Sequence, residues 1–351
     1  MNKTDIKSLT LDELIEEMKE LGLQKFRAKQ IYDWLHTKLV CSFEEMSNLS
    51  KNDRIKLAEK YEITSLRKEE VLESAIDGTR KYLFALKDGN VIESVWMKYK
   101  HGNSVCISSQ AGCRMGCRFC ASTLDGLARS LTASEMLDQI YQIQKDTNER
   151  VSNVVIMGSG EPLDNYENLV SFIRLLSNEN GLNISQRNIT VSTCGIVPKM
   201  YELADENLQI TLALSLHAPN DEVRKTLMPI ANQYSIEEVL KACQNYFEKT
   251  GRRITFEYSL VSGVNDNLDE ATQLSSLVKH MNCHVNLIPV NPIKERDFVQ
   301  SEWKNIENFK KLLEKNGINV TIRREMGRDI NGACGQLRKS YLEKSEQEGD
   351  E

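Results

Sequence analysis

The first part of the chain has the pattern of amphipathic helices. In residues 1–65, apolar residues recur at helical spacing, and Thr10 and Glu13 form the capping-box pattern that begins a helix. A second amphipathic run, over residues 25–40, carries aromatic and basic side chains. This run either contacts RNA phosphates or packs as part of a small helical module, and the pattern leaves both readings open.

A β-hairpin is predicted after this helical region. Residues 78–99 form two β-rich runs joined by Asp88-Gly89, a dipeptide typical of hairpin turns. Glu93 lies inside the second run, among apolar neighbours. An acid at such a position either points to solvent from the alternate face of the strand or has a functional role.

From about residue 103, strand and helix patterns alternate. The predicted strands are 104–108, 151–157, 188–193, 209–216, 253–260 and 284–290. Amphipathic helices are predicted between them at 132–145, 165–177, 235–249 and 268–281, and a helix at 301–316 and a strand at 318–324 follow. This alternation predicts an α/β fold with a parallel sheet wrapped by helices, curved into a partial (β/α)6 barrel.

The predicted domain organisation has four parts: a helical accessory domain over 1–75, a hairpin linker over 76–101, the barrel over 102–325 and a C-terminal segment over 326–351. Functional loops are expected at the carboxyl ends of the barrel strands.

Composition and charge narrow the class of protein. The chain is 40% hydrophobic and 27% charged, which excludes a disordered, collagenous or coiled-coil chain as a whole. No run approaches the roughly 18–20 apolar residues of a membrane span, and an apolar signal core is missing from the N-terminus, so we expect a cytoplasmic protein with no membrane partner. The net charge is −6, but residues 341–351 alone carry −4, so the body is near neutral and RNA binding is not excluded. Residues 321–339 carry a net charge of +3, which indicates either an RNA contact or a solvated face.

Three of the nine cysteines are close together in sequence. Cys113, Cys117 and Cys120 form a C-x3-C-x2-C pattern in the loop after the first predicted barrel strand. Three thiolates at this spacing can bind three irons of a 4Fe–4S cluster and leave the fourth iron open for another ligand. A structural zinc site would want four protein ligands, and unligated cysteines are the remaining alternative. The spacing favours the open cluster.

At this point the chain resembles the radical S-adenosylmethionine (SAM) superfamily. The cysteine pattern has an aromatic residue, Phe119, before its last cysteine, and Gly158-Ser-Gly160-Glu161-Pro162 is similar to the superfamily's GGEP motif. The resemblance implies that the open iron binds SAM and that SAM is cleaved to a 5′-deoxyadenosyl radical. It also implies that Gly160 and Glu161 contact the SAM amino group.

A closer resemblance covers nearly the whole chain. The segments VCISSQAGCRMGCRFCAST, MGSGEPLDNY, ITVSTCGIVP, LALSLHAPND, VNLIPVNP and DINGACGQLR are similar to those of the RlmN/Cfr family, within which they look more like RlmN. This resemblance implies methylation of adenine carbon 2 in 23S rRNA and tRNA. Cfr-type enzymes, which methylate carbon 8 and confer antibiotic resistance, tend to have GEA where this chain has Gly160-Glu161-Pro162. A non-enzymatic iron–sulfur RNA-binding protein is the alternative from another class, and it leaves Cys334 without a role.

The family resemblance also implies a route and its residues. One SAM methylates Cys334, and a second SAM supplies the radical that activates the S-methyl group, so two SAM are used per turnover. The carbon radical adds to the adenine, and Cys106 then attacks the Cys334 sulfur to release the product and leave a transient disulfide. Glu93 matches the position of a proposed proton acceptor.

Further SAM contacts are implied at the ends of predicted strands. The implied residues are Ser192, Ser215, Leu216, His217 and Asn291. His217 has the competing interpretation of a hydrogen-bonded core histidine. The expected partners are 23S rRNA, tRNA and an electron donor such as flavodoxin or ferredoxin, and the expected state is a monomer.

Overall fold

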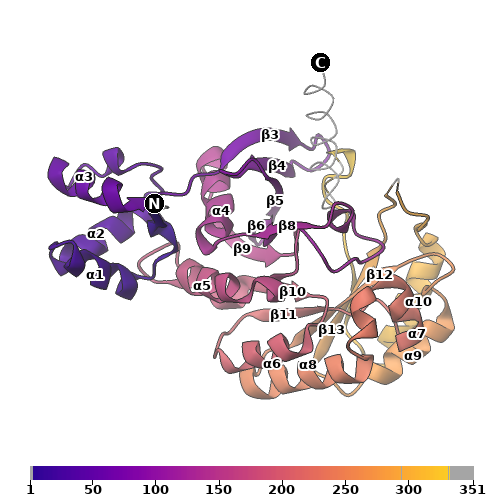
Figure 1. Cartoon of the computed structure of the whole chain (residues 1–351). Helices are drawn as coiled ribbons and strands as arrows, with labels where there is room; N and C mark the ends of the chain where they lie inside the picture. Colours follow the sequence, from indigo (N-terminus) through magenta and orange to yellow (C-terminus); the bar gives the residue numbers. More distant parts are fainter. Residues whose placement is uncertain (1–2, 294, 331, 333–351) are drawn as a thin grey trace.

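A ten-stranded mixed sheet is the frame of the molecule (Figure 1). The computed structural model describes residues 3–293, 295–330 and 332. The strand order is β14-β13-β12-β11-β10-β9-β6-β5-β4-β3. The strands are β3 (Arg67–Glu73), β4 (Arg80–Ala85), β5 (Val91–Tyr99), β6 (Gly102–Ile107), β9 (Val151–Ile156), β10 (Ile189–Thr193), β11 (Thr211–Ser215), β12 (Ile254–Leu260), β13 (Cys283–Pro289) and β14 (Val320–Ile322).

The parallel part of the sheet confirms the predicted barrel. Strands β6, β9, β10, β11, β12, β13 and β14 pair in parallel, each with the next. Parallel pairing needs crossover connections, and each of these contains a helix. These helices are α4 (Ala133–Thr147), α5 (Tyr166–Ser177), α6 (Val197–Asp205), α7 (Asp221–Leu227), α8 (Ile236–Thr250), α9 (Leu268–Val278) and α10 (Trp303–Lys315). The carboxyl ends of these strands therefore meet at one edge, where ligands bind in such folds.

The helix starts follow the capping signals in the sequence. Thr132 accepts the backbone N–H of Glu135 at 3.2 Å, and the Glu135 carboxylate accepts the Thr132 N–H at 2.9 Å, so α4 begins with a capping box. Helix α1 (Leu11–Glu20) begins in the same way at Thr10 and Glu13. Helix α6 was not predicted, because its nine residues are too few to show a clear helical period.

Strands β3–β6 form the antiparallel part of the sheet. The predicted hairpin is confirmed as β4 and β5, joined through a turn in which Gly89 has φ 85°. Strand β3 was not predicted because its sequence, RKEEVLE, has charged residues where a half-buried strand would alternate. A charged edge strand is a common protection against pairing with another chain.

The register of the hairpin places Glu93 inside the molecule. Lys81 pairs with Val95, and Leu83 pairs with Glu93, so all four side chains share one face of the sheet. The opposite face packs on α4, where the Ser94 hydroxyl donates to Gln139 at 2.8 Å. Glu93 is therefore buried rather than solvent-facing, which excludes the solvent-facing interpretation, and its functional role stays a prediction.

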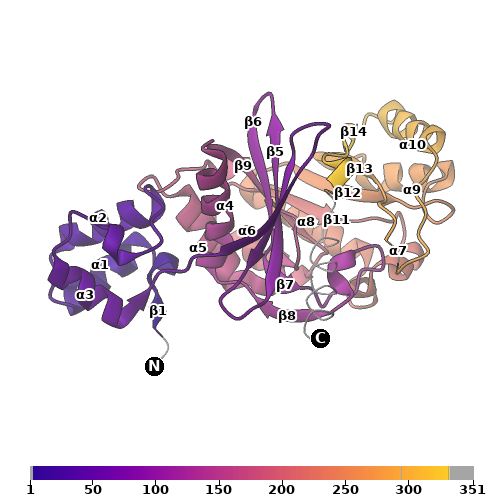
Figure 2. The same cartoon turned by 90° about the horizontal axis from the view of Figure 1, so that it is seen from above.

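The N-terminal helices form a separate lobe at the opposite end of the molecule from α9 and α10 (Figures 1 and 2). This module contains α1, α2 (Lys25–His36) and α3 (Lys51–Lys60). Short strands β1 (Thr4–Asp5) and β2 (Tyr61–Glu62) pair in parallel at its base. No described helix is long and apolar enough to cross a membrane.

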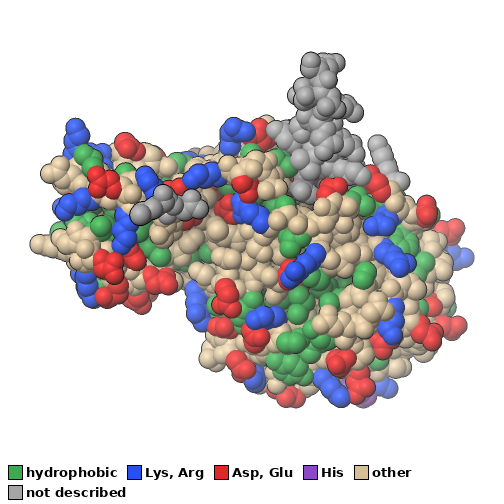
Figure 3. Space-filling view, viewed as in Figure 1, with side chains coloured by type: hydrophobic (Ala, Val, Ile, Leu, Met, Phe, Trp, Pro, Cys, Tyr) green, Lys and Arg blue, Asp and Glu red, His purple; other side chains and the backbone are tan. Residues whose placement is uncertain are grey.

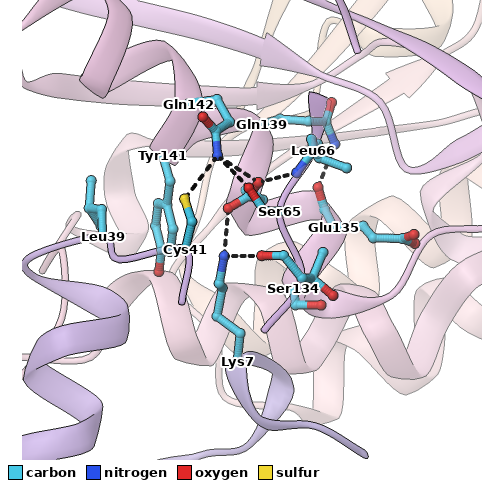
Figure 4. Close-up of polar contacts among 12 residues, drawn as sticks. Lys7, Leu39, Cys41, Ser65, Leu66, Ser134, Glu135, Gln139, Tyr141 and Gln142 are labelled. Carbon is cyan, nitrogen blue, oxygen red and sulfur yellow. Dashed lines mark hydrogen bonds and ion pairs between the residues drawn. The ribbon is translucent and has the colours of Figure 1, made fainter. Parts of the chain in front are cut away.

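A buried ion pair joins this module to the barrel. Lys7 and Asp138 of α4 are both 1% exposed, and their charged atoms are 2.6 Å apart. Asp138 also accepts the backbone N–H of Leu66 at 2.7 Å and the side-chain amide of Gln142 at 3.0 Å. Figure 4 shows Lys7 reaching toward α4 beside Tyr141 and Gln142. Separating the two charges would leave each buried and unpaired, which is strongly destabilising. The ion pair therefore holds the N-terminal module in a defined position on α4.

His36, at the same interface, makes the free energy of unfolding depend on pH. Its Nδ1 lies 2.8 Å from the hydroxyl of Tyr141, and burial, followed by the charge of Lys7, lowers the pKa of His36 to about 3. An unfolded histidine has a pKa of about 6.5, so between pH 6.5 and pH 3 the unfolded chain binds a proton that the folded chain does not.

We therefore expect His36 to make the protein less stable as the pH falls through this range. The loss attributable to His36 between pH 6.5 and pH 5.0 is about 1.5 kcal/mol of unfolding free energy. Urea unfolding of the wild type and of His36→Gln at both pH values measures it. The variant should lose correspondingly less stability, and equal losses in the two proteins would contradict a neutral buried His36.

Candidate active site

The three clustered cysteines lie on one loop whose ends are tied together. Strand β7 (Gln110–Gly112) pairs with β8 (Leu127–Ser130) in an antiparallel ladder, and the Cys113 N–H donates to the Gly126 carbonyl at 2.8 Å. Further hydrogen bonds shape the loop from within, since the Thr123 hydroxyl donates to the carbonyls of Cys117 and Cys120. The Arg118 N–H also donates to the Leu227 carbonyl, which joins the loop to α7. The loop is thus held from both sides.

These three thiols share one largely buried environment. All three line one cavity of about 240 Å³. Burial, and to a lesser extent the charge of Cys120, raises the pKa of Cys113 to about 12, and burial followed by the neighbouring cysteines raises that of Cys117 further. Raised pKa values mean that the buried thiols lose their protons at a free-energy cost. Bound iron offsets this cost, because metals bind cysteine as the thiolate. Among the described residues, no three His, Cys, Asp or Glu side chains converge as they would on one metal ion. A 4Fe–4S cluster needs each thiolate at a different iron.

Gly160 and Glu161 form the next wall of this cavity. Gly160 has φ 106°, and a Cβ there would lie 2.6 Å from the Gln110 Cβ, so the close approach to β7 requires glycine. The Glu161 carboxylate accepts the N–H groups of Cys194 at 2.8 Å and Leu163 at 3.0 Å. Burial raises the pKa of Glu161, and the Cys194 N–H opposes that rise. The carboxylate is thereby held in place, with lone pairs remaining for a cationic ligand group.

Most of the predicted strand-end residues line the same cavity. Ser192, Ser215, His217 and Asn291 all lie on its wall. Leu216 does not: its side chain is in the hydrophobic core, its N–H donates to Glu257, and its carbonyl accepts from Arg224. The structure therefore brings together four of these five residues.

His217 is both hydrogen-bonded and part of the cavity wall. Its Nδ1 accepts the backbone N–H of Ser259 at 2.8 Å, so the proton of the neutral ring is on Nε2. Burial, followed by the charge of Arg224, lowers the pKa of His217 to about 3, which keeps the ring neutral. Phe119 of the cysteine loop meets the ring edge-on at a centroid distance of 4.7 Å. His217 can therefore offer one N–H donor in a fixed direction.

Arg224 supports the cavity from behind. It is fully buried, and its guanidinium donates to the carbonyls of Cys194 at 2.7 Å and Leu216 at 3.2 Å, with longer contacts to Ser215 and Tyr234. These bonds tie the loop after β10 to the end of β11. Sequence reasoning missed Arg224, because a single arginine in a short helix carries no motif.

A second cavity, of about 670 Å³, adjoins the first. The two share wall residues, among them Met157, Gly158 and Arg323. Cys106 and Glu93 line the second cavity and not the first. Its volume is in the range typical of small-molecule sites.

The two candidate reactive groups of the second cavity, Glu93 and Cys106, come from the hairpin and β6. The Glu93 carboxylate lies 3.1 Å from the Lys81 ammonium, and both side chains are almost fully buried. Cys106 packs beside Val95 and Met97, and burial raises the pKa of its thiol, with Arg323 opposing the rise. The sequence held a signal for Lys81, because opposite charges at diagonal positions of a hairpin can pair across the strands.

The first residues of the C-terminal segment lie at this cavity. The Asp329 carboxylate accepts the Ser74 hydroxyl at 2.6 Å and the Ala75 N–H at 2.9 Å, and the Asp77 carboxylate accepts the Gly327 N–H at 3.0 Å. Gly332 lines the cavity itself. Cys334, together with Arg338, Lys339 and the acidic tail, lies outside the described residues.

Comparison with known proteins gives consistent matches. The Radical SAM superfamily model matches residues 107–274, and the model of the ribosomal RNA large subunit methyltransferase N-terminal domain matches residues 4–63. The chain is 67% identical over 343 residues to a probable dual-specificity RNA methyltransferase RlmN from Lachnoclostridium phytofermentans, covering 98% of this chain and 96% of that one. It is 68% identical over 340 residues to the protein of the same name from Lachnospira eligens, covering 97% of each chain. A radical SAM methyltransferase structure from Sphaerobacter thermophilus superposes with a TM-score of 0.90 at 41% identity, covering 95% of this chain and 98% of that one.

Proposed function

The chain belongs to the RlmN family of radical SAM RNA methyltransferases, and we propose that it methylates carbon 2 of an adenosine in the peptidyl-transferase loop of 23S rRNA and of the adenosine next to the anticodon in some tRNAs. The observation that supports this proposal most strongly is the pair of adjoining cavities, one lined by three clustered cysteines and the other by Cys106 and Glu93. Reductive cleavage of SAM would thus take place in the first cavity, and the reaction of the adenine base in the adjoining second cavity.

A 4Fe–4S cluster on Cys113, Cys117 and Cys120 would supply the electron that cleaves bound SAM, and the protein places the groups around it. Glu161 would accept hydrogen bonds from the SAM amino group, and Ser192, Ser215, His217 and Asn291 would contact the rest of the molecule. Arg224 would act indirectly by holding the two loops that carry several of these groups.

We assign Cys334 as the methyl carrier and Cys106, which lines the second cavity, as the residue that releases the product. The base would be joined to the Cys334 sulfur through the new methylene carbon. The Cys106 thiolate would attack that sulfur, so the sulfur–carbon bond breaks as the Cys106–Cys334 disulfide forms. The electron pair of the broken bond passes to the methylene carbon, which takes up a proton to become the methyl group. The described segment supports this assignment, since Gly332 lines the same cavity as Cys106 and lies two residues before Cys334. Two SAM molecules would be consumed per methylated base.

Glu93 would accept the proton lost from the ring carbon. The Lys81 ammonium, 3.1 Å away, would hold the Glu93 carboxylate in place in the second cavity. A proton acceptor of this kind typically contributes 10²- to 10⁴-fold to the rate.

Glu93→Gln is therefore expected to lower kcat for RNA methylation by about 100- to 10,000-fold. SAM cleavage to 5′-deoxyadenosine should continue, because the first cavity is unchanged. The matched control is Glu149→Gln, which replaces an acid that pairs with Lys98 at the surface and should retain wild-type turnover. Loss of SAM cleavage in Glu93→Gln would instead assign Glu93 to the SAM site, and unchanged methylation would remove it from the reaction.

The proposed function is tested with anaerobically reconstituted protein, SAM carrying a labelled methyl group and a chemical reductant. Label should enter a 23S rRNA fragment spanning the peptidyl-transferase loop, and tRNA, in step with 5′-deoxyadenosine formation. SAM cleavage without labelled RNA would contradict the substrate and leave the superfamily chemistry in place. We further infer a cytoplasmic monomer supplied by flavodoxin or ferredoxin, and these remain predictions.

A further inference from the structure

An exposed tryptophan stands at the entrance of the second cavity. Trp303 is the first residue of α10, its side chain is 59% exposed, and it lines the cavity that also contains Cys106 and Glu93. A single exposed apolar residue needs no explanation by itself. The surroundings of Trp303 give it a specific meaning.

The indole ring is anchored before any ligand binds. Its Nε1–H donates to the Glu307 carboxylate at 3.1 Å, one helical turn further along α10. A side chain that is already held in place loses less conformational freedom when a ligand packs on it. Trp303 is therefore a preorganised flat apolar surface.

Positive charge lies along the same entrance. Arg323, Arg324 and Arg328 line the cavity and are exposed. Arg328 lies 3.7 Å from Glu325, whereas Arg323 and Arg324 form no ion pair with any part of the chain that the structure describes. On the face shown in Figure 3, acidic and basic side chains are interspersed. Two arginines without acidic partners beside an exposed ring are thus a local feature, distinct from a general basic surface.

An aromatic surface beside arginines is the arrangement that binds unpaired nucleotides. Bases stack on aromatic side chains, and arginines neutralise the phosphates between them. A base that reacts inside the cavity must first leave its stack, so the base next to it loses a stacking partner. Trp303 is exposed and lines the same cavity, so its ring is available to replace that lost partner.

We propose that Trp303 stacks on an unpaired base adjacent to the target adenosine, and that Arg323 and Arg324 contact the phosphates on either side of it. This proposal rests on the proposed function, because it requires RNA to enter the second cavity. An acidic redox protein is the other macromolecule that an arginine-rich surface attracts. We favour RNA because the surface opens directly into the cavity that holds Cys106 and Glu93, where the base would react.

The test measures RNA binding by the full-length, cluster-loaded protein, with a fluorescent 23S rRNA fragment spanning the peptidyl-transferase loop. Trp303→Ala should raise the Kd about 5- to 100-fold, which corresponds to the loss of one stacked base, and Trp303→Phe should recover most of the affinity. The control variant is Tyr201→Ala, which removes an exposed aromatic side chain of α6 that lines neither cavity and should leave the Kd unchanged.

A second readout does not depend on affinity. The chain has three tryptophans, of which Trp96 is buried and Trp34 lies in the N-terminal module. Saturating RNA should quench tryptophan emission in the wild type by more than in Trp303→Phe. Two results together distinguish stacking from a purely structural role of Trp303. They are the recovery of RNA affinity in Trp303→Phe and the smaller RNA-dependent quenching in the same variant.

Three results would overturn the proposal. The first is a Trp303→Ala variant that binds RNA with wild-type affinity, and the second is RNA-dependent quenching that persists in Trp303→Phe. The third is a variant of Arg323 or Arg324 that binds RNA with wild-type affinity but whose iron–sulfur cluster is reduced more slowly by flavodoxin. That result would assign the surface to the electron donor. Failure of the proposed function gives a different result from failure of this proposal. If the proposed function is wrong, the wild-type protein itself does not methylate RNA, whatever residue stands at position 303.

Discussion

Cys117→Ala is expected to lose the iron–sulfur chromophore and RNA methylation together. Cys117 lines the first cavity with Cys113 and Cys120, and a cluster bound by two thiolates would not hold an open iron in the right place. We expect no detectable methylated RNA and no 5′-deoxyadenosine. Iron and sulfide analysis and the visible absorption spectrum measure the cluster, and analysis of 5′-deoxyadenosine and methylated RNA measures the other two effects on the same reconstituted sample.

Cys194→Ala is the matched control for this change. Cys194 is equally buried and lines the same cavity, but it is outside the C-x3-C-x2-C pattern. Its backbone N–H, which the substitution retains, holds the Glu161 carboxylate. The variant should keep a full complement of iron. Loss of the cluster from Cys194→Ala would make Cys194 a fourth ligand, and that would exclude the open iron on which SAM binding depends.

Cys106→Ala is expected to abolish release of methylated RNA and to trap the RNA on the protein. Without the Cys106 thiol, nothing attacks the Cys334 sulfur, so the covalent bond between the base and Cys334 should persist. A denaturing gel of the reaction with labelled 23S rRNA fragment would show a protein–RNA band that nuclease shortens. SAM cleavage in the first turnover should continue, because Cys106 is absent from the first cavity.

The control for this change is Cys283→Ala, which removes another buried cysteine of the barrel outside both cavities. It should turn over without an accumulated band. If Cys106→Ala released product at the wild-type rate, Cys106 would have no part in the reaction. If the trapped band also formed with Cys334→Ala, the covalent bond would be to another residue.

The barrel and its cysteine loop could be predicted because their signals are local. Each parallel strand is a short apolar run followed by an amphipathic helix, and capping boxes such as Thr132 with Glu135 mark helix starts. The cysteines needed only their spacing. The charged edge strand β3 and the short helix α6 lack such patterns, and they were missed.

The functional environment of these residues depends on contacts between distant segments. The buried position of Glu93 follows from the register of β4 and β5, and its pairing with Lys81 follows from the same register. Arg224 acquires its role only when the loop after β10 and the end of β11 meet around it. In the sequence, Trp303 is part of a predicted amphipathic helix, and only the fold brings it to the cavity that Arg323 and Cys106 also line. Sequence therefore identified the candidate chemistry, whereas the supporting and entrance residues required the structure.

The most direct test of the account is the position of the new methyl group. Cluster-loaded wild-type protein is incubated anaerobically with SAM, reductant and the 23S rRNA fragment, and the digested nucleosides are separated and identified by mass spectrometry against 2-methyl- and 8-methyladenosine standards. The account predicts 2-methyladenosine, absent from the Cys334→Ala reaction. The 8-methyl product, or SAM cleavage with no methylated adenosine, would contradict it.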